Sequence, residues 1–474
     1  SALRAAVPGS VIALARGRYE EPVVLHDGVS LRGACSAETT LHLPSTGAAT
    51  QTVAAVGSDT ALRSVTVTGA GWGIVVQGAS ASLALEGVIV RSVAELAIAV
   101  TEGASLSGSD VAILLGGSSA AGIEIADSSV SLESLSIIEP FDVGVLAYGA
   151  AATCELGGAV VRGARVAGGD ATGSALVAED GARIVLRRGV IVGSAASGVY
   201  LHRGASAELE DVLVRDSAHI GVELWGASIV ARRARVAGSR ILGVHLRDST
   251  AVLDDVVIDD SGPSEAAGRG IGLLAWDATV RGSRIALRRN HLAGIVAHRA
   301  SELTIDDVVI ADTRSEAVEQ RYGRGLTLSR GARAVITRAR IERVRDYGIA
   351  IGEEATSLSC ADCTVLETMP QGCFQTTCGS SGAGVGIGIA SGATLRASSL
   401  AIRESSAIGM QVLEGGSVDV EGGVISRQPI GLNLQTTAVD VGRDLRGVMF
   451  LENARNLARE DRPGPDFPEA LFDR

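Results

Sequence analysis

A glycine followed by alternating apolar residues recurs along almost the whole chain. Examples are "GVYLH" at 198, "GVELW" at 221 and "GVHLR" at 243, and the commonest step between copies is 22–24 residues. Two further short apolar segments follow each copy, such as "AVLD" and "VVIDD", and short polar turns separate them. A period of this length indicates a stacked repeat fold, because one such unit is too small to bury an apolar face alone.

Three short strands per repeat predict a parallel β-helix in which each repeat forms one coil. Glycine accounts for 60 of the 474 residues and aromatic residues for 3 %, which suits many tight turns around a narrow aliphatic core. No segment with a helical period is long enough to supply crossover helices, so a doubly wound α/β fold is not expected. We therefore expect an all-β chain that forms a single solenoid of about 15 coils.

The domain boundaries follow from where the repeat begins and ends. The solenoid is expected over residues 1–459, with residues 1–10 as the remnant of an N-terminal cap. Residues 366–384 form a cysteine-bearing loop insert, and the Pro-rich, charged residues 460–474 form a tail that leaves the last coil.

The opening stretch "ALRAAVPGSVIALARGRYEEPVVLHDGVSLRGAC" (2–35) and the repeat together resemble the right-handed parallel β-helix proteins of the pectin-lyase-like superfamily. The resemblance covers nearly the whole chain and implies a right-handed β-helix. It implies little about activity, because this fold carries lyases, hydrolases, esterases, epimerases, adhesins and inert rods. In the enzymes, substrate lies along the sheet built from the Gly-led strands. We find none of the motifs of the Lys-dependent lyases, polygalacturonases, pectin esterases or epimerases, and the chain has no Lys.

Rings and charges concentrate on the Gly-led strands of the central coils, at the third and fifth positions, which face outward. The fifth position carries Tyr148, Ala178, His202, Trp225, Arg247, Trp276 and His298 in turn, and the third carries Tyr200, Glu223 and His245. Sugar rings stack on exposed aromatic faces, and arginine pairs with anionic groups. The alternative is that the rings stack on one another across coils and hold Arg247 by a cation–π contact.

These observations lead to three interpretations of function. The first is an exported, non-catalytic scaffold or carbohydrate-binding surface protein, whose ligand surface is the patch of Tyr148, His202, Trp225, Arg247, Trp276 and His298. The second is a polysaccharide-active enzyme, such as a lyase, hydrolase or epimerase, which uses Tyr200, Glu223, His245 and Arg247 as base, acid and cation. The third is a purely structural surface rod.

The partners and the location follow from charge and hydropathy. A net charge of −12 argues against nucleic acid, and no apolar run approaches the roughly 18 residues of a membrane span. We expect a polysaccharide or cell-surface glycan as the partner, no cofactor, and a location outside a bacterial cell. A signal or anchor would lie in a segment that this sequence does not contain.

Acidic pairs recur before the third strand of several repeats. The residue that directly precedes this strand alternates in sign over six coils, as Asp211, Arg235, Asp255, Arg284, Asp307 and Arg340. Opposite charges on neighbouring strands attract and like charges repel, so we interpret the repeated aspartates as a structural charge ladder. The pairs Asp254–Asp255 and Asp306–Asp307 leave a calcium site as the weaker alternative.

The cysteines favour an oxidising compartment. Four of the six, Cys360, Cys363, Cys373 and Cys378, lie close together and are predicted to form disulfides. Sequence leaves three connectivities open, and the spacing also permits zinc. Cys35 and Cys154 are expected not to pair, because roughly five coils separate them and a disulfide tolerates only a short Cα separation. Disulfides would favour an exported protein.

Overall fold

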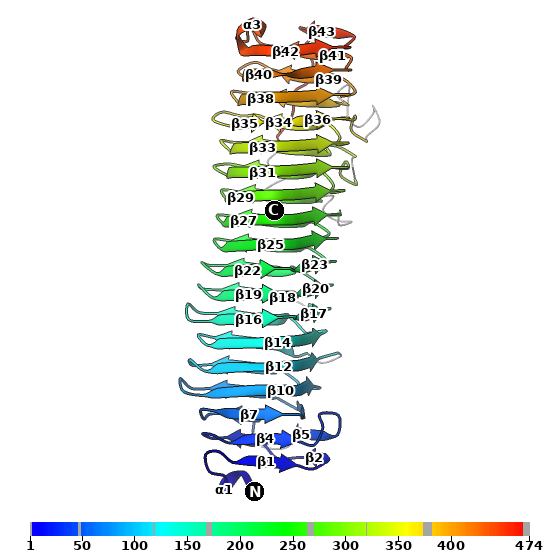
Figure 1. The fold of residues 1–474 in the computed structure, drawn as a ribbon. Coiled ribbons are helices and arrows are strands. Elements are labelled where there is room, and N and C mark those ends of the chain that lie inside the picture. The colour runs from blue at the N-terminus through cyan, green and yellow to red at the C-terminus, as the bar shows by residue number, and fades with distance from the viewer. Residues whose placement is uncertain are drawn as a thin grey trace. The chain divides into compact units, whose positions relative to one another are not determined.

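The computed structural model describes residues 2–45, 49–116, 119–166, 173–262, 270–318, 320–372 and 382–467. The chain forms two compact units, one of residues 1–218 with 222–230 and the other of residues 219–221 with 231–474. In each unit, parallel strands stack into two sheets, which we name sheet A and sheet B (Figure 1). The predicted all-β, right-handed parallel β-helix is confirmed. Among the described residues, no helix has the length and hydropathy of a membrane span.

The first unit begins with the short helix α1 (Ala2–Ala5). Its sheet A contains β1 (Val11–Leu14), β2 (Gly17–Tyr19), β4 (Ser30–Gly33), β5 (Thr39–Leu43), β7 (Thr60–Arg63), β8 (Thr66–Gly69), β10 (Ser82–Arg91), β12 (Ser105–Leu114), β14 (Ser129–Ile138), β16 (Thr153–Gly157), β17 (Val160–Arg162), β19 (Arg183–Arg187), β20 (Val190–Val192), β22 (Ser206–Glu210) and β23 (Leu213–Arg215). Its sheet B contains β3 (Val23–Leu25), β6 (Gln51–Ala55), β9 (Trp72–Gln77), β11 (Leu96–Thr101), β13 (Ala121–Ala126), β15 (Val143–Tyr148), β18 (Ser174–Glu179) and β21 (Val199–His202).

Two strands contain residues of both units, namely β24 (Ile220–Trp225) in sheet B and β25 (Ser228–Ala237) in sheet A. In the second unit, sheet A contains β27 (Thr250–Asp259), β29 (Thr279–Arg288), β31 (Glu302–Ala311), β33 (Arg333–Glu342), β35 (Ser357–Ala361), β36 (Thr364–Leu366), β38 (Thr394–Arg403), β40 (Ser417–Ser426) and β42 (Leu445–Leu451), with helix α3 (Val441–Asp444) before the last strand. Sheet B contains β26 (Leu242–Arg247), β28 (Ile271–Trp276), β30 (Ala293–His298), β32 (Arg324–Ser329), β34 (Tyr347–Ile351), β37 (Val385–Ile389), β39 (Ile408–Val412), β41 (Ile430–Leu434) and β43 (Arg455–Ala458).

The core of each unit consists of columns of aliphatic side chains, one from each coil. In the second unit, one column of sheet B reads Val244, Leu273, Ile295, Leu326 and Ile349, and every member is at most 3 % exposed. Side chains alternate between the two faces of a strand, so the apolar alternation of the repeat places one column inside and the next outside.

In most coils, the second and third predicted strands are one continuous strand of sheet A with a corner in the middle. In β27 the corner is Asp255, whose φ is 53°, and pairing with β29 continues on both sides of it. One left-handed residue turns the chain without breaking the ladder. Asp and Asn adopt this conformation more readily than most non-glycine residues, but Arg284 also occupies such a corner, with a φ of 51°.

The predicted charge ladder exists, but two of its members were assigned wrongly. The strand pairing places Arg338, and not Arg340, beside Asp307, because Ala339 pairs with Val308 and Arg340 with Val309. Likewise Arg233, and not Arg235, has the left-handed φ of a corner residue, at 49°. Arginine recurs every second residue in both segments, so the apolar pattern could not indicate which arginine occupies the corner.

In the second unit, the members of this charge ladder form side-chain ion pairs between neighbouring coils. Arg338 contacts Asp306 at 2.6 Å and Asp307 at 2.5 Å, and Arg284 contacts both Asp254 and Asp255 at 2.5 Å. These hydrogen bonds hold the pKa of Asp255 and of Asp307 below the ordinary value. All four aspartates of the calcium alternative are thus engaged by arginine.

A second ladder, which the sequence analysis missed, lies at the corners that follow several sheet A strands of the second unit. Arg289 pairs with Asp260 at 2.7 Å, Arg343 with Asp312 at 2.7 Å, and Arg427 bridges two glutamates. Arg235 contributes here, since it contacts the buried carboxylate of Asp259 at 2.7 Å. At these corners, opposite charges on neighbouring coils attract each other.

A disulfide links Cys360 to Cys363 and closes the turn between β35 and β36. Cys373 and Cys378 lie outside the described residues. Cys35 is an exposed free thiol, whereas Cys154 is a buried one whose pKa is raised to about 12 by burial.

Candidate functional site

The outward residues of the predicted patch belong to both units, and each unit is considered separately. In the first unit, Tyr148, Glu179, His202 and Trp225 follow one another in a single outward column of sheet B. The prediction placed Ala178 in this column, which was one residue out of register, because Ala178 pairs with the inward Ala147. This strand begins with Ser174 and lacks the leading glycine that sets the register elsewhere.

Trp225 presents an indole that is 41 % exposed and held in place by a carboxylate. Its Nε1 donates to Oε1 of Glu223 at 3.0 Å, and Oε2 of Glu223 accepts from the hydroxyl of Ser197 at 2.7 Å. The ring is therefore fixed before any ligand arrives, which lowers the entropy cost of binding on its face.

Beside it, the rings of Tyr200 and His202 stack with their centroids 5.0 Å apart and an interplanar angle of 18°. Nε2 of His202 lies 3.2 Å from Oε1 of Glu179. Burial, with the charges of Glu223 and Glu179, raises the pKa of Tyr200. Farther along the column, Tyr148 donates to Glu124 at 2.8 Å, and burial together with this bond raises its pKa to about 12. Both phenols are thus hydrogen-bond donors at neutral pH.

In the second unit, Trp276 is not the exposed ring that we expected, because it is only 5 % exposed. It contacts the ring of His298 at a centroid distance of 4.7 Å, and Arg299 and Arg247 lie over it at 4.7 and 5.8 Å. Stacking across coils, with Arg247 in a cation–π contact, is thus the arrangement that the structure shows here. The half-exposed Arg247 also lies 3.8 Å from its neighbour Asp248.

The two histidines that were expected to face outward in this unit, His245 and His298, are also buried. His298 is fully buried and its Nδ1 contacts the hydroxyl of Ser329 at 2.7 Å, while His245 is 6 % exposed. Among the described residues, no cluster of three or more His, Cys, Asp or Glu has the arrangement of a metal site.

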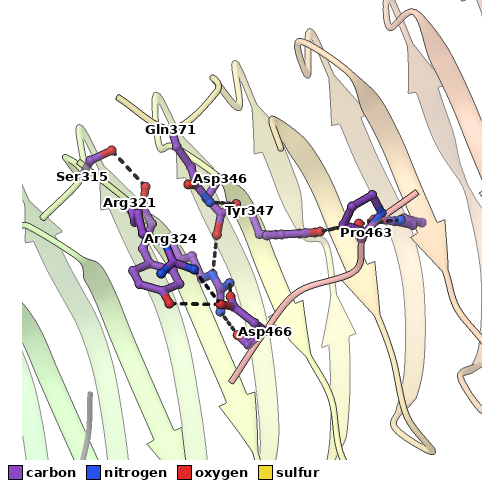
Figure 2. A network of polar contacts seen from close by, with 10 residues as sticks. Ser315, Arg321, Arg324, Asp346, Tyr347, Gln371, Pro463 and Asp466 are labelled. Carbon is purple, nitrogen blue, oxygen red and sulfur yellow. Dashed lines mark hydrogen bonds and ion pairs between the residues drawn. The ribbon is translucent and has the colours of Figure 1, made fainter. Parts of the chain in front are cut away.

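A second site, missed by the sequence analysis, lies on the outer face of sheet B in the second unit. Residues 459–467, most of which belong to the predicted C-terminal tail, lie back across this face, where Asp466 meets Arg324 (Figure 2). The residues around this meeting point line a cavity of about 270 Å³. The sequence did contain a feature that could have indicated this site, namely a charged residue, Arg324, at a column position where other coils carry Ala, Val or Ile.

Comparison with known proteins supports the fold. Residues 220–383 match a family described as a right-handed beta helix region. No curated protein matches the sequence.

Among solved structures, the chain is similar to a periplasmic alginate epimerase, AlgG, at 10 % identity and a TM-score of 0.33, over 79 % of this chain and 77 % of that one. It is also similar to the A-module of the mannuronan C-5 epimerase AlgE4 of Azotobacter vinelandii, at 11 % identity and a TM-score of 0.28, over 80 % and 89 %. The alginate lyase AlyGC matches at 10 % identity and a TM-score of 0.27, over 96 % and 98 %.

At these identities and scores, the neighbours carry no argument about activity. Together with the parallel sheets, the match over residues 220–383 supports a right-handed parallel β-helix fold.

Proposed function

We propose that this protein is an exported carbohydrate-binding β-helix, and that the outer face of sheet B around Trp225 is its ligand surface. The observation that carries the proposal is the half-exposed indole of Trp225, whose Nε1 is hydrogen-bonded to Glu223, which in turn accepts from Ser197. A pyranose stacks its C–H face on such a ring, and the neighbouring carboxylates and phenols provide acceptors and donors for its hydroxyls. The disulfide between Cys360 and Cys363 supports export, because disulfides persist in oxidising compartments.

The test is a glycan array of neutral and acidic polysaccharides, probed with the purified chain and with Trp225→Ala. We expect the variant to lose at least about tenfold in affinity, since truncating an aromatic anchor at the centre of a site costs ~2 kcal/mol or more. Trp72→Ala is the matched control, because Trp72 is 37 % exposed and its Nε1 also donates to a carboxylate, that of Glu95. Equal losses in the two variants, or no binding by any of the proteins, would refute the proposed site.

The enzyme interpretation is tested on the same ligand. Tyr200 lies between Glu223 and Glu179, so the face holds groups that could transfer protons. New reducing or unsaturated ends that depend on Glu223 would establish turnover. If the glycan stays intact while Glu223→Gln still binds it, binding alone is the function of this face.

A further inference from the structure

The second site lies in the other unit and goes beyond the proposed function. Residues 459–467 are held on sheet B mainly through their main chain, by amide side chains at outward positions of β41, of β39 and of the turn after β41. Asn433 makes a pair of bonds with the N–H and C=O of Glu460 at 3.0 and 3.1 Å. Gln435 donates to the carbonyls of Glu460 and Arg462, at 2.9 and 2.8 Å. Gln411 donates to the carbonyls of Arg462 and Pro463, at 3.3 and 3.2 Å.

These contacts are of the kind that a sheet edge makes with an added strand, except that amide side chains provide the donors. Such hydrogen bonds require a peptide main chain and do not depend on the side chains of the bound peptide. Pro463 and Pro465 restrict the segment to extended conformations, which lowers the entropy cost of holding it.

The far end of the segment is recognised by its side chains. Nη2 of Arg324 donates to Oδ1 of Asp466 at 2.7 Å, and Nη1 donates to the main-chain carbonyl of Asp466 at 2.7 Å. Oδ2 of Asp466 accepts from the hydroxyl of Tyr322 at 3.0 Å and from Arg321 at 3.2 Å. One carboxylate therefore receives three donors, and Figure 2 shows Asp466 beside Arg324.

Arg324 is fixed independently of the segment. Its Nε donates to Oδ2 of Asp346 at 2.6 Å. Gln371 donates to the other oxygen of Asp346 at 2.7 Å. The rings of Tyr322 and Tyr347 lie 4.9 and 5.4 Å from the guanidinium carbon. The guanidinium is thus preorganised to present its outward N–H groups to an anion.

A glycine makes room for the last residue of the segment. A Cβ on Gly352 would lie 2.1 Å from Cε2 of Phe467. The phenyl ring also lies 5.7 Å from the guanidinium carbon of Arg324. The floor is therefore shaped for an aromatic side chain that directly follows the acidic one.

We infer that this face is a peptide-binding groove for an extended segment with the pattern Pro-Asp-Phe, and that residues 459–467 are its resident ligand. The favoured partner is a protein that presents an acidic residue followed by an aromatic residue in an extended, proline-containing segment. Main-chain recognition by Gln411, Asn433 and Gln435 favours a peptide over an acidic glycan. The tethered segment competes at an effective concentration on the order of millimolar. A partner therefore binds only when its own concentration and affinity outcompete the segment, or when the contacts of the segment with the groove are weakened.

The experiment uses a fluorescein-labelled peptide with the sequence of residues 459–467 and measures its anisotropy with the full-length chain. In the full-length Asp466→Ala/Phe467→Ala variant, we expect the peptide to bind at least about tenfold more tightly than to the unmodified chain, because the competing segment has lost its anchors. A peptide with Asn in place of the Asp that corresponds to Asp466 should bind about 10- to 100-fold more weakly, since hydrogen bonds to a charged group contribute ~1.5–3 kcal/mol.

Two controls keep the outcome decisive. Adding Gly352→Ala to the weakened chain should abolish peptide binding, whereas Gly442→Ala in α3, whose Cβ would lie 3.4 Å from Oδ1 of Asp440, should not. If the double variant does not fold, as judged by circular dichroism, the single Asp466→Asn chain replaces it, with the same order of affinities expected. The inference is overturned if the peptide does not bind the weakened chain, if the Asn peptide binds equally well, or if an oligouronate binds there and the peptide does not.

Discussion

Removing one partner of the buried ion pair between Arg324 and Asp346 should destabilise the fold far more than removing one partner of an exposed corner pair. The side chains are 4 % and 1 % exposed, so Asp346→Asn leaves a buried guanidinium whose remaining anionic partner, among the described residues, is the half-exposed Asp466. Breaking a buried pair on one side costs about 3–5 kcal/mol. We expect the lower end of this range because Asp466 remains, which is a factor of roughly a hundred in the unfolding equilibrium.

The control is the same substitution at Asp307. Asp346 and Asp307 have left-handed φ angles of 59° and 56°, which Asn tolerates, and each accepts from an arginine. They differ in exposure, because the side chain of Asp307 is 45 % exposed and solvent screens its pair. Urea-induced unfolding followed by far-UV circular dichroism compares the two variants.

Equal destabilisation by Asp346→Asn and Asp307→Asn would refute the reasoning that burial determines the strength of these pairs. A further check is the double variant Arg324→Met/Asp346→Asn, which removes both charges from the buried site. It should recover part of the stability lost in Asp346→Asn, because no uncompensated charge remains buried.

Three further predictions concern other parts of the chain. The pKa of Asp312 is lowered by its arginine partner. The stability that this pair contributes is therefore full above the ordinary carboxyl pKa near ~4 and is lost as pH falls through the lowered pKa. Thermal melts between neutral and strongly acidic pH should show this loss, and a melting temperature that does not change with pH would contradict it. Gly352→Ala should expose the terminal segment to limited proteolysis, whereas Gly442→Ala should leave its cleavage rate unchanged. Iodoacetamide should label the exposed Cys35 and spare Cys154, whose pKa is raised to about 12; peptide mass mapping that finds Cys154 labelled first would count against its burial.

The candidate sites show where sequence reasoning succeeded and where it stopped. The outward positions of Tyr200, Glu223 and Trp225 could be identified from the strand period alone, because the period is two and glycine marks the register. The burial of Trp276 could not be identified in this way, since it depends on Arg247, Arg299 and His298 packing against the ring.

The sequence by itself determined the coil, because alternation of apolar and polar residues and the residues at the corners act within one repeat. Tertiary structure decided which arginine faces which aspartate, as at Arg338 and Arg340, because register is a relation between coils. It also decided the course of the terminal segment. Asp466 bonds to Arg324 across 142 residues, and neither residue has a local pattern that indicates the other. Contacts of this kind exist only after the coils between them have stacked.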